Sequence, residues 1–170
     1  GGVVFEYQVS PDGRSVVYRA EQDALDVVEL FSRPIDASEP SIKLNSALPE
    51  GERVVRFALS SSGKFVVYGA AQEVAGRSEL FVVPVTGGAA PVKLNGPIDD
   101  NGAVVQFRIS PDENWVVYRA NVGGAGVFEL YSRPLDGSGA AVRLNGSLEE
   151  GSVESTFYVS PDSQFVLYSA

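Results

Sequence analysis

"VSPDGRSVVYRA", residues 9–20, has the pattern of one β-strand ending, a tight turn and a second strand beginning. The phrase returns three times along the chain, as "LSSSGKFVVYGA" at 59–70, "ISPDENWVVYRA" at 109–120 and "VSPDSQFVLYSA" at 159–170. The spacing is always 50 residues, with no insertion or deletion. Self-similarity at a fixed period is the signature of a repeat architecture, in which each repeat packs against its neighbours. The repeats are therefore 1–50, 51–100, 101–150 and a partial fourth, 151–170.

The turn within this phrase is favoured by residues that act for separate physical reasons. Pro11 presets φ for the first corner, and Gly13 tolerates a positive φ. The side chains of Ser10 and Asp12 are able to bond nearby backbone N–H groups. The second repeat has Ser-Ser-Ser-Gly-Lys at 60–64 instead of this sequence, so we expect a looser turn there.

Each repeat contains four short runs that are rich in Val, Tyr and Phe and bounded by Gly, Pro, Asp or Asn, a composition typical of β-strands. In the first repeat these runs are 3–10, 15–20, 27–34 and 41–45. Four antiparallel strands in every 40 to 50 residues or so are typical of a β-propeller blade. We predict an all-β fold, a β-propeller fragment with three full blades and the first hairpin of a fourth. A solenoid or a β-sandwich is the alternative, although sandwich strands differ in length and the period here is strict.

The pattern also predicts which residues are buried and which strand lies at the blade edge. The tyrosines of the second strand and the leucines of the third are expected in the core: Tyr18, Tyr68, Tyr118, Leu30, Leu80 and Leu130. The fourth strand is expected at the outer edge, where a central cation deters pairing with foreign strands. That cation is Lys43, Lys93 or Arg143.

The order "SPDG", "VVY", "ELF" and "KLN" resembles the WD-like β-propeller repeats of the TolB type, with related blades in the propeller domains of prolyl-oligopeptidase-type enzymes. The resemblance covers the whole chain, and the second repeat departs from it at the turn. It implies a propeller that is secreted, periplasmic or on the bacterial cell surface and that binds proteins. It transfers no catalytic residue, because the chemistry of the enzyme relatives lies in a separate hydrolase domain.

Composition excludes several classes of function. The chain has no His and no Cys, so a Ser-His-Asp or Cys-His site and a metal site with imidazole or thiolate ligands are impossible. We therefore predict no catalytic residues, no metal site and no cofactor. The net charge of −9 argues against nucleic acid as a partner, because phosphates require a basic surface. No apolar run has the length of a membrane-spanning helix, so no membrane is expected either.

Two sets of polar strand residues recur at equivalent positions. Glu29 and Glu129 are expected to form structural ion pairs with Arg19 and Arg119 on the neighbouring strand, whereas Glu79 faces Gly69. A second set lies on the innermost strand and changes from blade to blade. We expect it to line the central channel, where a ligand site could lie: Glu6, Arg56, Gln106 and Thr156.

Acidic residues gather in the loops that follow the second and fourth strands of each repeat, and these loops contain no Lys or Arg. Because strands alternate in direction, these loops are expected at one face of the propeller. The predicted partner surface consists of Asp23, Asp26, Glu50, Glu52, Asp99, Asp100, Glu149 and Glu150. Its expected partner is a basic protein segment or, weakly, Ca²⁺, since no Asp-x-Asp-x-Asp-Gly loop is present.

These observations predict a non-enzymatic binding or assembly module. The alternatives are a regulatory or substrate-selecting propeller of a larger hydrolase, and a structural repeat array on a cell surface. The chain starts at Gly1 and contains no Met, so we expect a processed piece or a fragment. An open blade face at each end predicts a homodimer that closes a ring of about seven blades. Phe157 and Tyr168 are expected in the seam between the two copies.

Overall fold

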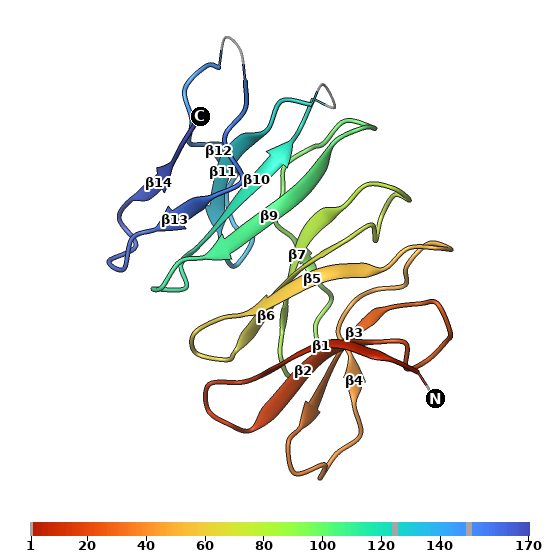
Figure 1. The fold of residues 1–170 in the computed structure, drawn as a ribbon. Coiled ribbons are helices and arrows are strands. Elements are labelled where there is room, and N and C mark those ends of the chain that lie inside the picture. Colours follow the sequence, from red (N-terminus) through yellow and green to blue (C-terminus); the bar gives the residue numbers. More distant parts are fainter. Residues whose placement is uncertain (1, 124–125, 149–150) are drawn as a thin grey trace. The chain divides into compact units, whose positions relative to one another are not determined.

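The computed structural model describes residues 2–123, 126–148 and 151–170, and Figure 1 labels the strands except β8. The described residues form strands and turns, and none forms a helix. Accordingly, no helix in the described ranges is long and apolar enough to cross a membrane. The chain divides into two compact units. Unit 1 comprises Gly1–Gly76 and Phe81–Val92, and unit 2 comprises Arg77–Leu80 and Lys93–Ala170.

Three antiparallel sheets have four strands each, in sequential order, and a fourth sheet is a two-stranded hairpin. Blade 1 consists of β1 (Val4–Val9), β2 (Ser15–Ala20), β3 (Glu29–Pro34) and β4 (Ile42–Lys43). Blade 2 consists of β5 (Val54–Leu59), β6 (Phe65–Ala70), β7 (Glu79–Pro84) and β8 (Val92–Lys93). Blade 3 consists of β9 (Ala103–Ile109), β10 (Trp115–Asn121), β11 (Glu129–Pro134) and β12 (Val142–Arg143). The hairpin consists of β13 (Phe157–Val159) and β14 (Val166–Tyr168).

The turn between β1 and β2 is built as its sequence predicts. The Ser10 hydroxyl donates to Asp12 Oδ1 at 2.6 Å and accepts the Ser15 N–H at 2.9 Å. Asp12 Oδ1 also accepts the Arg14 N–H at 3.1 Å. The hydrogen bond from Ser10, followed by that from Arg14, lowers the pKa of the Asp12 carboxyl below its ordinary value. Gly13 has a φ of 68°, so its freedom to adopt positive φ is used.

The same turn is looser in blade 2, as expected. Ser62 replaces the aspartate, and its hydroxyl lies 3.2 Å from that of Ser60. The Phe65 N–H donates to the Ser60 hydroxyl at 3.2 Å, compared with 2.9 Å for the equivalent bond in blade 1. A hydroxyl accepts less strongly than a carboxylate, which accounts for the longer contact between Ser60 and Ser62.

Each unit contains a core formed where consecutive repeats pack together. In unit 1, Val17 and Leu30 of blade 1 pack with Phe57 of blade 2. In unit 2, equivalent residues of blade 3 pack with Phe157 of the hairpin. The predicted core residues Tyr68, Tyr118, Leu30, Leu80 and Leu130 are at most 1% exposed. Tyr18 is an exception, because it is only half-buried.

Candidate functional site

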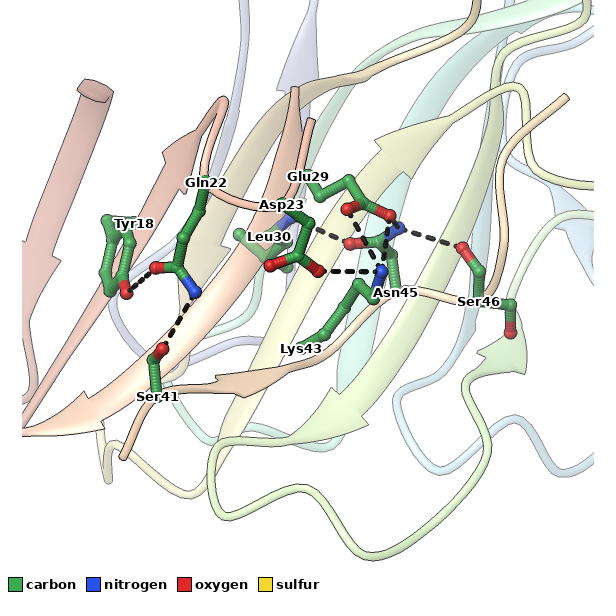
Figure 2. A network of polar contacts seen from close by, with 9 residues as sticks. All are labelled: Tyr18, Gln22, Asp23, Glu29, Leu30, Ser41, Lys43, Asn45 and Ser46. Atoms are coloured by element: carbon green, nitrogen blue, oxygen red, sulfur yellow. Dashed lines mark hydrogen bonds and ion pairs between the residues drawn. The ribbon is translucent and has the colours of Figure 1, made fainter. Parts of the chain in front are cut away.

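The recurrent glutamates of the third strand are partnered differently from the sequence prediction. Glu29 pairs with Lys43, whose Nζ lies 3.0 Å from Oε1 (Figure 2), and the predicted pair with Arg19 is wrong. Arg19 instead pairs with Glu6 at 3.0 Å. The reason is the register, in which Arg19 lies opposite Leu30 and Glu29 lies opposite Ala20. Since successive side chains point to opposite faces of a sheet, Arg19 and Glu29 cannot meet.

The same pairing recurs in the other blades. Lys93 Nζ lies 2.6 Å from Glu79 Oε1, and Arg143 Nη1 lies 2.8 Å from Glu129 Oε1. The predicted pair between Glu129 and Arg119 is therefore also wrong, and Arg119 donates to the Val153 carbonyl at 2.7 Å. The cation of the edge strand thus neutralises a carboxylate of the third strand, which is a structural role.

An asparagine completes this network and explains why the fourth strand is only two residues long. Asn45 Oδ1 accepts the Leu30 N–H at 2.8 Å, and Nδ2 donates to the Ser46 carbonyl at 2.8 Å (Figure 2). The side-chain oxygen therefore accepts the Leu30 N–H hydrogen bond that the backbone of a longer β4 would accept. Asn95 and Asn145 bond the Leu80 and Leu130 N–H groups at 2.7 and 2.8 Å.

The predicted channel-lining residues do not share one environment. In unit 1, Glu6 is tied to Arg19, and Arg56 is exposed. The pKa of the Arg56 guanidinium is lowered, mainly because nearby protein atoms remove part of its hydration and secondarily because Arg19 is close, while the Glu6 carboxylate opposes this shift. In unit 2, Gln106 is half-buried and Thr156 is exposed. A ligand site at these positions stays a prediction.

The predicted acidic surface has members in both units. In unit 1, Asp23 pairs with Lys43 at 3.1 Å, and Glu52 accepts the Gly76 N–H at 2.6 Å. Asp26 and Glu50 of unit 1 and the two carboxylates of unit 2, Asp99 and Asp100, are exposed. Glu149 and Glu150 lie outside the described residues. Within the described ranges, no group of three or more His, Cys, Asp or Glu side chains could hold a metal ion.

Each unit has one apolar sheet face that is open. On β1, Phe5, Tyr7 and Val9 are 52%, 68% and 45% exposed, and we call them the β1 face. Tyr7 occupies the repeat position of Phe57 and Phe157, which are 4% and 0% exposed. Within each unit, the phenylalanine at this position, Phe57 or Phe157, packs onto the preceding repeat.

The hairpin has the complementary open face, formed by Tyr158, Phe165 and Leu167, which are 59%, 68% and 59% exposed. We call these residues the hairpin face. Tyr158 lies opposite Leu167 in the register, so the two side chains share one side of the hairpin. Leu167 occupies the repeat position of Val17 and Val117, which are 0% and 2% exposed beneath the repeat that follows them.

The expected placement of Phe157 and Tyr168 in a seam between two copies needs correction. Phe157 is already buried against blade 3, in the core of unit 2. Tyr168 lies opposite Phe157 and so points to the same side of the hairpin. Because side chains alternate along a strand, Leu167 and Phe165 are the residues that point away from blade 3.

Comparisons with known proteins identify the fold. No family model and no curated protein matches the sequence. Among solved structures, prolyl oligopeptidase B from Galerina marginata is similar, with a TM-score of 0.66 and 11% identity over 98% of this chain and 26% of that chain. A protein from Agrobacterium tumefaciens assigned as TolB has a TM-score of 0.42 and 16% identity over 98% of this chain and 69% of that one. The similarity to the peptidase confirms the predicted fold, a β-propeller fragment of four-stranded antiparallel blades.

Proposed function

We propose that this β-propeller chain is a non-enzymatic assembly module that associates with a second copy of itself, the β1 face of one copy packing on the hairpin face of the other. The observation that carries the proposal is the exposure of Tyr7, since Phe57 and Phe157 at equivalent positions are buried and Phe107 is half-buried. Contiguous apolar faces of this kind are rarely left bare on a soluble monomer.

The two faces are of opposite and complementary types. In unit 1, Phe57 packs against Val17 of the repeat before it. Tyr7 of the β1 face occupies the repeat position of Phe57, and Leu167 of the hairpin face occupies that of Val17. The β1 face of one copy could therefore pack on the hairpin face of the other in the same way. Two copies related by a twofold axis would cover both faces of each chain.

A non-enzymatic role is supported by the residues available for chemistry. The chain has no His and no Cys, and Ser60 and Ser62 hydrogen-bond within a turn. The repeated Glu and Lys or Arg side chains form structural pairs. A secreted, periplasmic or cell-surface location, which the resemblance implies, stays a prediction.

Light scattering on the purified chain tests the self-association. We expect a particle of twice the 18.0 kDa monomer mass at micromolar concentration. Tyr7→Asp and Leu167→Asp should each yield the monomer, because each places a charge in the proposed contact. Ile35→Asp is the matched control, since Ile35 is 55% exposed in the turn after β3 and lies on neither face.

Two results would contradict the proposal. One is a parent chain that stays monomeric at micromolar concentration, which would favour covering of these faces by other blades. The other is a dimer that persists in both aspartate variants, which would place the contact elsewhere on the chain.

We also propose that the exposed acidic loops attract a basic protein segment. Asp26, Glu50, Asp99 and Asp100 are exposed and pair with no Lys or Arg in the described part of the chain. An octalysine peptide should bind, and the affinity should fall with rising salt, because exposed charges are screened. The double variant Asp99→Asn and Asp100→Asn should weaken binding several-fold more than Glu39→Gln, an exposed charge in a loop outside this set. An equal loss of affinity in the double variant and in Glu39→Gln would contradict a role for these loops.

A further inference from the structure

A pocket of about 610 Å³ lies within unit 2. The lining combines charged and polar side chains from β7, β8, β11 and the residues beside them with apolar residues. The lining consists of Arg77, Glu79, Lys93, Asn95, Gly96, Pro97, Ile98, Arg133, Ala140 and Ala141. The volume is in the range of small-molecule sites in proteins.

The two arginines of the pocket have hydrogen-bond donors to spare. Arg77 donates to the Ile98 carbonyl at 3.2 Å, and its Nε lies 3.6 Å from Glu79 Oε1, beyond hydrogen-bond distance. Arg133 donates to the carbonyls of Lys93 and Gly137 at 3.1 and 2.7 Å and has no carboxylate partner among the described residues. The Nε atoms of both are buried without an acceptor. A guanidinium has five donors, so both groups can bind further oxygens.

The charge of the pocket is opposite to that of the chain. Three of its four charged lining side chains are cationic, although the whole chain carries −9. The one carboxylate, Glu79, is in contact with Lys93 at 2.6 Å. A concave site with this balance attracts anions even on an acidic protein, because the local charges dominate at short range.

Comparison of the repeats indicates that the blades do not need these arginines in order to fold. Val27 and Val127 occupy the position of Arg77 in blades 1 and 3. Val83, which is 2% exposed, occupies the position of Arg133 in blade 2. A valine at either site avoids the desolvation of a charge. Arg77 is therefore a departure from the repeat, whereas Arg133 has the same residue as its equivalent in blade 1, Arg33.

We propose that this pocket binds a small ligand whose carboxylate or phosphate lies against Arg77 and Arg133. The guanidinium group matches both oxyanions with paired hydrogen bonds. The apolar part of the ligand would lie against Pro97, Ile98 and the alanines at 140 and 141. This site does not depend on self-association.

Calorimetric titration and NMR of the arginine Nε–H signals test the site with three probes: inorganic phosphate, phenyl phosphate and benzoate. Phenyl phosphate should bind more tightly than inorganic phosphate because it also contacts the apolar wall. Comparison of phenyl phosphate with benzoate decides between phosphate and carboxylate. Arg77→Val and Arg133→Val should each weaken binding about tenfold or more, the loss expected for a charged hydrogen bond.

Arg33→Val is the matched control. Arg33 occupies the repeat position of Arg133 in blade 1, is exposed and lies outside the pocket, so its loss should change binding less than about twofold. Should Arg77→Val fail to fold by circular dichroism, Arg133→Val and Arg133→Gln decide the question. Absence of binding of all three probes at tens of millimolar, or equal binding by the pocket variants and Arg33→Val, overturns the proposal.

Discussion

Replacing Phe57 with alanine should lower the free energy of unfolding by about 3–5 kcal/mol, the usual loss for a buried aromatic side chain. Phe57 is 4% exposed and packs with Val17 and Leu30 in the core of unit 1. The alanine would leave a cavity that surrounding side chains fill only in part. Tyr7→Ala, at the equivalent repeat position, should cost less than about 0.5 kcal/mol, because Tyr7 is 68% exposed.

Denaturant unfolding followed by circular dichroism measures both losses. Both variants are best compared in the Leu167→Asp background, which keeps the proposed dimer from contributing. A loss below about 1 kcal/mol at Phe57 would contradict its place in the core. A loss at Tyr7 as large as that at Phe57 would mean that the β1 face is covered within a single copy in solution.

Glu79→Gln should have the second largest effect and lower the free energy of unfolding by about 2–4 kcal/mol. The Glu79 side chain is 0% exposed, and its carboxylate lies 2.6 Å from Lys93 Nζ and 3.6 Å from Arg77 Nε. A neutral amide would remove a buried negative charge that lies beside these cations. The Lys93 side chain is 29% exposed and can turn partly toward water. The expected loss of unfolding free energy is therefore below that of a fully buried pair.

Glu129→Gln is the matched control for this prediction. The Glu129 side chain is 19% exposed and that of its partner Arg143 is 46% exposed, so solvent screens the pair and the loss should be about 1 kcal/mol or less. Denaturant midpoints of the two variants give the comparison. Equal losses would show that burial does not set the strength of these pairs.

Much of the blade could be predicted from sequence because its determinants are local. The turn residues Ser10, Pro11, Asp12 and Gly13 and the runs of Val, Tyr and Phe act over a few neighbouring residues, and the 50-residue period repeats them. The strand order β1-β2-β3-β4 follows from the same pattern. The predicted third and fourth strands were longer than observed, since Asn45 replaces backbone partners of β3.

The partners of charged side chains were predicted poorly. Arg19 and Glu29 lie on neighbouring strands, and only the register places them on opposite faces of the sheet. A shift of one residue reverses the face of every side chain in a strand, so adjacency in the sequence pattern does not identify a contact. The same alternation places Phe157 toward blade 3 and Leu167 away from it.

The sequence by itself determined the blade, its turns and the apolar positions, because backbone preference and two-residue alternation are local properties. Tertiary structure decided which charges meet, which aromatic residues stay exposed and where a pocket forms. Arg77 and Arg133 line one pocket although they are far apart in the chain, and no pattern within a single repeat brings them together. Such contacts depend on how repeats pack, and that packing is set by side chains from both repeats at once.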